Sequence, residues 1–223
     1  SLGDSFMTSI IAIANIAGGT HKTTAAHSLS VATVEYGKKV LLIDLDPRAE
    51  LTFNVGFERS RETIAEMLQG SSLAQSNDIT TDERFDFIGA ESRLTALNDV
   101  NSIKTFLKGL PNHYDVIIID TPSQIDPRMA MAFSAADSIV IPSDSSIHSI
   151  RGALNTSKIQ SNAKKFILPI NQFSAEHTKH FSDAIVLDAL IPVSTGIDAA
   201  IAQKRSVLSA DKNSDFAQAY REA

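Results

Sequence analysis

Short apolar runs alternate with segments of helical composition, and this alternation restricts the fold more than any other feature of the sequence. The runs that are expected to form strands begin at Ile10, Val40, Phe85, Val116, Ser138 and Phe166. Residues 23–36, between the first two runs, are expected to form a helix that ends before Gly37. A strand, a helix and a strand within about 40 residues have the spacing of a βαβ unit, whose two strands lie parallel.

The rest of the chain continues this pattern. Further helices are expected over residues 63–68, 103–110, 130–136, 150–159, 177–184 and 215–222. No repeat, low-complexity linker or change of composition divides the chain. We therefore expect an α/β fold with a mostly parallel, twisted sheet and helices on both faces, in a single domain over residues 9–223. Residues 1–8 are expected to be a disordered or cloning-derived N-terminal segment.

The composition excludes several kinds of functional site. The 223 residues contain no cysteine, which rules out disulfide frameworks, thiolate zinc sites, iron–sulfur clusters and cysteine nucleophiles. No apolar run approaches the roughly 18 to 20 residues of a membrane span. The net charge of −6 does not favour a protein that wraps nucleic acid over its whole surface, although it is compatible with a local basic patch. A cytoplasmic protein is expected.

Glycine-rich or acidic sequences follow three of the expected strands. They are GGTHKTT at residues 18–24, DLDP at residues 44–47 and DTP at residues 120–122. In an open parallel sheet, ligands bind at the carboxyl ends of the strands, where loops and helix N-termini meet. Gly18 and Gly19 allow the main chain to approach a ligand closely, and the next helix directs its positive end at an anion.

The side chains in these sequences are those of a phosphoryl-transfer site. Lys22 offers a charge for terminal phosphates, Thr23 offers a hydroxyl for Mg²⁺, and Asp120 is placed to anchor that metal. Each motif alone has a simpler interpretation, since a Gly-Gly pair forms tight turns and a strand-end aspartate often caps a helix. Three such motifs at successive strand ends are harder to explain as turns, so a nucleotide site is predicted.

The three motifs resemble those of the ParA family of deviant Walker A ATPases, the partition proteins of plasmids and chromosomes, to which the MinD group is related. The family patterns K-G-G-x-G-K-T-T, D-x-D-P-Q and D-x-P/A-P correspond here to AGGTHKTT, DLDPR and DTPS, at residues 17–24, 44–48 and 120–123. The resemblance continues through residues 140–152 and 191–223, so it covers nearly the whole chain.

The resemblance implies an ATP-dependent dimerisation switch. In the family, ATP and Mg²⁺ bind across a face-to-face homodimer, the dimer holds DNA non-specifically, and a centromere-binding, ParB-like partner stimulates slow hydrolysis. Lys204, Arg205 and Arg221 are the candidate DNA contacts of this chain and would associate it with the nucleoid. The same residues on solvated helix faces would look no different in the sequence, so both interpretations stay open. A MinD-like role at the membrane is not expected, because residues 215–223 are too short and too acidic for a membrane-binding helix.

The resemblance also implies a role for each site residue. Lys22 would contact the β- and γ-phosphates, Thr23 would bind Mg²⁺, and Asp46 would orient or activate the attacking water, so Lys22 and Asp46 are the expected catalytic residues. Asp44 and Asp120 would support the metal. The other expected nucleotide-binding residues belong to the loop or lie near the adenine: Gly18, Gly19, Thr20, His21, Thr24, Asn171 and Pro192.

The chain departs from the family pattern at three positions. Ala17 stands where the family has a signature lysine that reaches the partner's phosphates, so this charge is absent. His21 stands where the family has a glycine, although a histidine tolerates the left-handed backbone better than most residues do. Arg48 replaces a glutamine. It could restore a positive charge near the γ-phosphate, but a surface pair with Glu50 is the favoured interpretation.

These departures leave two functions open. One is a ParA-like ATPase switch, which is favoured by the retained lysine, threonine and aspartates of the motifs. The other is a non-hydrolysing interaction protein that keeps the fold and uses nucleotide structurally or not at all, which is favoured by Ala17 and His21.

Overall fold

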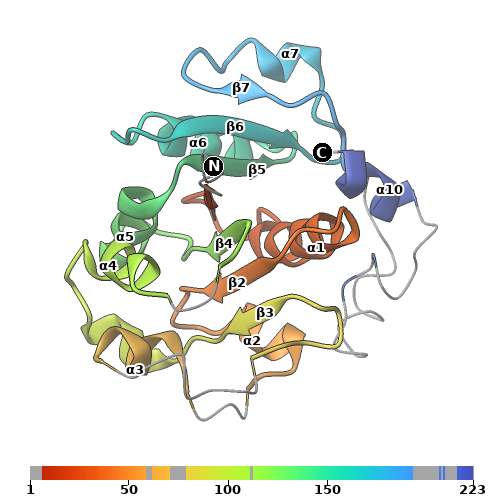
Figure 1. Ribbon diagram of the computed structural model, residues 1–223. Helices are drawn as coiled ribbons and strands as arrows, with labels where there is room; N and C mark the ends of the chain where they lie inside the picture. Colours follow the sequence, from red (N-terminus) through yellow and green to blue (C-terminus); the bar gives the residue numbers. More distant parts are fainter. Residues whose placement is uncertain are drawn as a thin grey trace, which may run out of the picture.

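Seven strands form one sheet within the part of the chain that the structure describes (Figure 1). The computed structural model describes residues 7–58, 62–70, 79–110, 113–192, 206, 208 and 215–222. The strand order is β3, β2, β4, β1, β5, β6, β7, and each named strand pairs with its neighbours in parallel. The predicted α/β fold with a parallel sheet is confirmed.

Strands and helices follow one another along the chain much as the apolar runs predict. The strands are β1 (Ser9–Ile13), β2 (Val40–Asp44), β3 (Asp86–Ile88), β4 (Val116–Asp120), β5 (Ser138–Ser143), β6 (Lys164–Pro169) and β7 (Ile185–Val186). The helices are α1 (Lys22–Glu35), α2 (Glu50–Val55), α3 (Ile64–Leu68), the 3₁₀ helix η2 (Ser92–Ala96), α4 (Ser102–Lys108), α5 (Pro127–Ala135), α6 (Ile147–Ser157), α7 (Ala175–Thr178) and α10 (Asp215–Glu222).

Two helices begin earlier than predicted because polar side chains cap them. The Asp126 carboxylate accepts hydrogen bonds from the main-chain N–H groups of Arg128 and Met129, which starts α5 at Pro127 rather than at residue 130. The Ser146 hydroxyl accepts the N–H of Ser149 at 3.1 Å, which starts α6 three residues before the predicted position.

The helix predicted over residues 177–184 is wrong for most of its length. The structure has a single turn at α7, followed by β7, which pairs with β6 and extends the sheet. Helix α2 and the 3₁₀ helix η2 were not predicted, because their few residues give no extended helical pattern.

Alternate residues of the central strands face two separate apolar layers. Ile43 and Ile119 belong to a layer that includes side chains of α3, α4 and α5, whereas Leu42 and Ile118 belong to a layer under α1 and α10. All four side chains are at most 1% exposed. Successive side chains of a strand point to opposite faces, so strands covered on both sides are apolar throughout. This arrangement confirms helices on both faces of the sheet (Figure 1).

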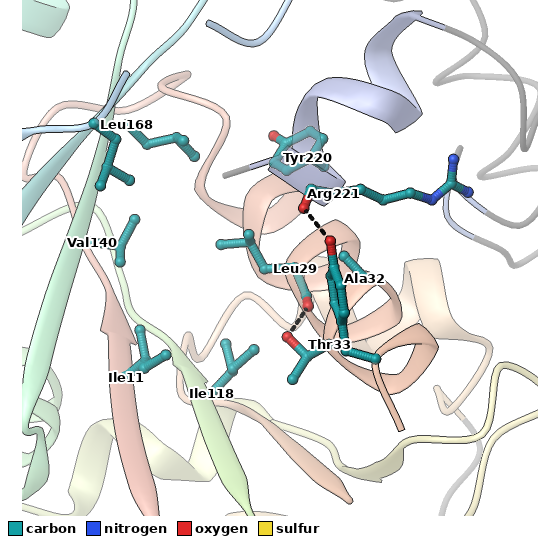
Figure 2. A pocket seen from close by; sticks show the side chains of 11 residues that line it. Ile11, Leu29, Ala32, Thr33, Ile118, Val140, Leu168, Tyr220 and Arg221 are labelled. Carbon is teal, nitrogen blue, oxygen red and sulfur yellow. Dashed lines mark hydrogen bonds between the residues drawn. The ribbon is translucent and has the colours of Figure 1, made fainter. Parts of the chain in front are cut away.

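The second half of α1 is covered by α10, although the two helices lie far apart in the sequence (Figure 2). The Arg221 Nε donates to the Glu35 carboxylate at 2.6 Å, and the Tyr36 hydroxyl donates to the main-chain carbonyl of Arg221 at 3.1 Å. None of the helices in the described ranges has both the length and the apolarity needed to cross a bilayer.

The strand register aligns the ends of the three strands that carry the motifs. Ile13 of β1 is the partner of Asp120 in β4, and Asp120 is also the partner of Asp44 in β2. The segments that follow these residues therefore leave the sheet side by side. This edge positions the candidate site.

Candidate functional site

The glycine-rich loop (residues 17–24) connects β1 to α1 and exposes its main chain. Gly19 has a φ of 67° and His21 a φ of 68°, both in the left-handed region. His21 thus adopts the conformation that a glycine would favour, as the sequence analysis anticipated for a histidine. Gly18 and Gly19 are exposed, and a Cβ on either would meet no atom within 4 Å. A ligand can approach the loop backbone from this side.

The N-terminus of α1 begins within this loop and presents its positive end to it. His21 is the N-cap residue and makes no side-chain capping hydrogen bond, and the first turn contains no acidic residue. Because His21 does not cap the helix, the first N–H groups of α1 are available to bind an anion, which the helix dipole also favours.

Lys22 folds back over the loop. Its ammonium group donates to the Ser123 hydroxyl at 2.6 Å and to the Ala17 carbonyl at 3.5 Å, and the residue is only 7% exposed. Burial lowers the Lys22 pKa from its usual value, while the nearby carboxylates of Asp120 and Asp46 act in the opposite direction. The cation therefore lies among carboxylates at the mouth of the loop.

Thr23 and Asp120 form the part of the site that fits Mg²⁺. The Thr23 hydroxyl donates to Asp120 Oδ2 at 3.1 Å. The other carboxylate oxygen, Oδ1, is buried and has no hydrogen-bond partner. Burial raises the Asp120 pKa well above its usual value, and the negative charge of Asp44 raises it further. A cation beside Asp120 would supply the missing partner and stabilise the ionised carboxylate.

No group of three or more His, Asp or Glu side chains with metal-binding geometry occurs among the described residues. A magnesium ion at Thr23 would therefore take most of its ligands from phosphate oxygens and water, as is usual for Mg²⁺ bound with a nucleotide.

Asp44 is fully engaged by protein donors. Its Oδ1 accepts the N–H of Asp46 at 3.0 Å, and its Oδ2 accepts the N–H and the hydroxyl of Thr52 at 3.0 and 2.7 Å. Burial raises the Asp44 pKa to about 7, although these hydrogen bonds oppose the shift. Asp44 thus ties β2 to α2 beside Asp120.

Asp46 is held by Arg48. The Arg48 Nη2 donates to Asp46 Oδ2 at 2.9 Å, Nε donates to both carboxylate oxygens at 3.2 and 3.4 Å, and the Arg48 N–H donates to Oδ1 at 3.0 Å. The favoured prediction that Arg48 pairs with Glu50 is wrong: the short turn at Pro47 brings the guanidinium back onto Asp46 instead.

The start of the loop is fixed to the end of β5 and packs against α6. The Asn15 side chain donates to the Pro142 carbonyl at 3.0 Å, and its Oδ1 accepts the N–H of Ala17 at 2.9 Å. A Cβ added at Gly152 would lie 2.3 Å from Asn15 Oδ1 and 2.5 Å from the Ala17 Cβ, so only glycine fits. Ala17 is consequently 6% exposed.

Several polar groups around the loop were not predicted as site residues. Ser123 and Asn15 lie inside or next to the motifs, so their position beside a strand end was the available signal. Asp144 lies 3.7 Å from the His21 ring, and the His148 ring is 3.2 Å from the Gly18 carbonyl. These two residues follow β5, and only the sheet order brings them to the loop.

The remaining predicted nucleotide-binding residues lie in two places. Thr20 is buried and donates to the Ala17 carbonyl at 3.2 Å, and Thr24 is half-buried in the first turn of α1. Asn171 and Pro192 lie next to each other at the end of β6, since the Asn171 N–H donates to the Ile191 carbonyl at 2.6 Å.

The predicted DNA contacts are only partly described. Lys204 and Arg205 lie outside the described residues. Arg221 lies on α10, and its guanidinium pairs with Glu35 at 2.6 Å.

The family is decided by a comparison with known proteins. A family model described as an AAA domain, AAA_31, matches residues 8–172, which is most of the chain. The chain belongs to the ParA/MinD/Soj family of P-loop ATPases. The resemblance stated on the three motifs is thereby confirmed.

Individual members of the family differ in how much of their length is matched. The sporulation initiation inhibitor protein Soj of Bacillus subtilis is 33% identical over 168 residues, which cover 69% of this chain and 66% of Soj, just under two thirds of that protein. The chromosome partitioning protein ParA of Caulobacter vibrioides is 27% identical over 242 residues, which cover 95% of this chain and 90% of that protein.

Solved structures show the same fold. The septum site-determining protein MinD of Pyrococcus horikoshii OT3, solved in complex with Mg-ADP, superimposes with a TM-score of 0.80 at 23% identity. The superposition covers 97% of this chain and 94% of MinD. This chain therefore shares the fold of MinD, a relative that was solved with a bound nucleotide and magnesium.

Proposed function

We propose that this family member is an ATP-dependent switch of the ParA type, which binds ATP with Mg²⁺ at the glycine-rich loop and hydrolyses it slowly. One observation carries the proposal. The edge of the sheet brings together an open loop backbone, the Lys22 ammonium group, the Thr23 hydroxyl and the buried, incompletely paired Asp120 carboxylate. These are the groups that a triphosphate and its metal require.

In this proposal the residues divide the work of binding and hydrolysis. The loop N–H groups and Lys22 hold the phosphates, and Thr23 with Asp120 holds Mg²⁺, which when bound neutralises charge on the β- and γ-phosphates. Asp44 supports Asp120 from the neighbouring strand. Asp46 orients a water molecule whose oxygen bonds to the γ-phosphorus as the bond to the bridging oxygen breaks, which releases ADP and phosphate.

The wider role is proposed from the family. The switch would form a homodimer on ATP binding, respond to a ParB-like partner and hold DNA non-specifically through Lys204, Arg205 and Arg221, in the cytoplasm at the nucleoid. The name of the Caulobacter relative, a chromosome partitioning protein, supports this role. DNA retention that requires ATP and falls steeply with added salt would support it, and retention that is the same without ATP would contradict it.

A second candidate function is a nucleotide-bound scaffold that does not hydrolyse ATP. It is favoured by Ala17, whose buried methyl group against Gly152 places no charge at the loop entrance. Phosphate release from the wild-type protein separates the two candidates, with Asp46→Asn as the control for contaminating ATPases. Release from the wild-type protein that Asp46→Asn abolishes supports the switch. No release from the wild-type protein, or release that Asp46→Asn leaves unchanged, supports the scaffold.

The first test of either function is a calorimetric titration with ATP and Mg²⁺. We expect Lys22→Ala to weaken binding by at least about 100-fold, because it removes a charge that contacts two phosphates. Lys38→Ala is a matched control, since Lys38 is an exposed lysine just beyond the other end of α1. The proposed nucleotide site is refuted if the wild-type protein does not bind ATP at millimolar concentration.

A further inference from the structure

Two cations meet at one hydroxyl group at the mouth of the glycine-rich loop. The Ser123 oxygen accepts a hydrogen bond from the Lys22 ammonium group at 2.6 Å and a longer one from Arg48 Nη2 at 3.5 Å. Arg48 therefore lies close to the group that is expected to contact the terminal phosphates. Its guanidinium adds a second positive charge at this place.

The Arg48 guanidinium is also the partner that occupies Asp46. Its Nε and Nη2 approach both carboxylate oxygens, at 2.9 to 3.4 Å. The Asp46 side chain is 10% exposed and the Arg48 side chain 67% exposed. The arginine approaches from solvent and closes off an otherwise buried carboxylate. With both oxygens engaged in this way, Asp46 is not available to orient a water molecule.

The arginine side chain can leave this position without a change in the backbone. The Arg48 N–H donates to Asp46 Oδ1 and forms a local turn that does not depend on the guanidinium. The side chain is long and mostly exposed, so its rotation disturbs no packed core.

A γ-phosphate would compete with Asp46 for the guanidinium. A terminal phosphate carries more negative charge than a carboxylate and presents paired oxygens that match the planar fork of arginine. A diphosphate, which ends one group earlier, offers no such partner at this distance from the loop. The nucleotide itself would thus decide where the arginine lies.

We propose that Arg48 is the γ-phosphate sensor of this chain: on binding of a nucleoside triphosphate its guanidinium exchanges Asp46 for the terminal phosphate and releases Asp46 to orient the water. This inference rests on the proposed nucleotide site. Arg48 supplies, from the same chain, a charge near the γ-phosphate that Ala17 does not provide. Its exchange of partners makes hydrolysis conditional on the triphosphate.

The test compares the affinities for Mg-ATP and Mg-ADP in each of several proteins. Mg-ATP and Mg-ADP are titrated into the wild-type protein, Arg48→Ala and Arg48→Lys. Arg93→Ala is the matched control, because Arg93 is likewise exposed and paired with two carboxylates, those of Glu66 and Glu91, at the contact between η2 and α3. We expect Arg48→Ala to weaken ATP binding by at least about tenfold and ADP binding by less than threefold, the difference being one charge-assisted contact.

The lysine variant and the control sharpen the result. Arg48→Lys should recover only part of the ATP affinity, because lysine keeps the charge and loses the fork, and Arg93→Ala should change neither affinity. Equal losses for ATP and ADP in Arg48→Ala, or no loss for ATP, would overturn the sensor while the nucleotide site stands. A wild-type protein that binds neither nucleotide would overturn both.

Discussion

Helix α1 borders two regions of opposite character. Its first turn borders the glycine-rich loop, where exposed main chain and Lys22 meet three buried carboxylates, those of Asp44, Asp46 and Asp120. Its second half borders an apolar cavity of about 210 Å³, lined by side chains of α1 itself and of β1, β4, β5, β6 and α10, among them Leu29, Ile118 and Tyr220 (Figure 2).

The difference shows what makes a chemical site in this fold. The cavity is lined mostly by apolar side chains, and its charged lining residue, Arg221, is paired with Glu35. The loop end is open because Gly18 and Gly19 leave the backbone exposed where parallel strands end and a helix dipole begins. The direction of the strands and of α1, rather than the presence of a cavity, concentrates polar groups at one end of α1. The two ends should therefore respond to mutation independently.

The largest expected effect is a loss of stability at the apolar end. Ile118 is 1% exposed and lines the cavity, so Ile118→Ala enlarges it and should cost about 2–5 kcal/mol of unfolding free energy in urea denaturation. The ATP affinity of the folded protein should change by less than about threefold, because no polar contact of the site is touched. A larger loss of affinity would show that the two ends are coupled.

Gly152→Ala tests the close packing contact between the glycine-rich loop and α6. The added methyl group would lie 2.3 Å from Asn15 Oδ1, so we expect a loss of about 1–3 kcal/mol together with weaker ATP binding, since Asn15 holds the Ala17 N–H. Gly109→Ala, whose Cβ would meet its nearest atom at 3.6 Å, is the control for a glycine replacement. Equal effects of the two replacements on ATP affinity would contradict this role of the α6 contact.

Asp44 should make stability depend on pH. Burial raises its folded pKa to about 7, above its value in the unfolded chain, so the folded state binds the proton more tightly. This contribution is fully present at low pH and is lost as pH rises through about 7. Between pH 6 and pH 8 the Asp44 contribution should fall by about 1 kcal/mol.

Asp44→Asn isolates this contribution from other titrating groups. We expect a smaller decrease in unfolding free energy between pH 6 and pH 8 in the variant than in the wild-type protein, measured by urea denaturation without nucleotide. An identical pH profile in both proteins would show that the Asp44 carboxyl does not titrate in this range.

The smallest expected effect is at His21. Because its backbone already has the left-handed conformation, His21→Gly should preserve the loop and change ATP affinity by less than about threefold in calorimetry. The lost contact with Asp144 is 3.7 Å long and lies near solvent, so it adds little. A much larger drop in affinity would instead indicate a direct contact between the imidazole and the nucleotide.

Much of the fold follows from local patterns in the sequence. The apolar runs place the strands from β1 to β6, and the spacing between them predicts parallel pairing, because a helix between two strands returns the chain to the same edge. The boundaries of α5 and α6 were missed, although Asp126 and Ser146 are visible capping residues. The strand β7 was missed because two residues give no pattern.

In the candidate site, too, the residues in the motifs were predicted, whereas some of their contacts were not. The loop, Lys22, Thr23, Asp44, Asp46 and Asp120 were all proposed from motifs at strand ends. Ser123 was overlooked within a quoted motif, and the partner of Arg48 was predicted incorrectly, because a side chain of that length reaches several carboxylates and only the turn geometry selects one.

The sequence by itself determined the class of fold, the edge of the sheet where the motifs gather and the residue types available there. Periodicity and strand-end position are local properties, and local properties can be inferred from a single sequence. The tertiary structure alone decided that Asp44 accepts hydrogen bonds from α2, while one oxygen of Asp120 has no hydrogen-bond partner. It also decided that Arg48 pairs with Asp46 and that Gly152 of α6 packs against Ala17. These outcomes depend on distances between segments that are brought together only when the sheet assembles.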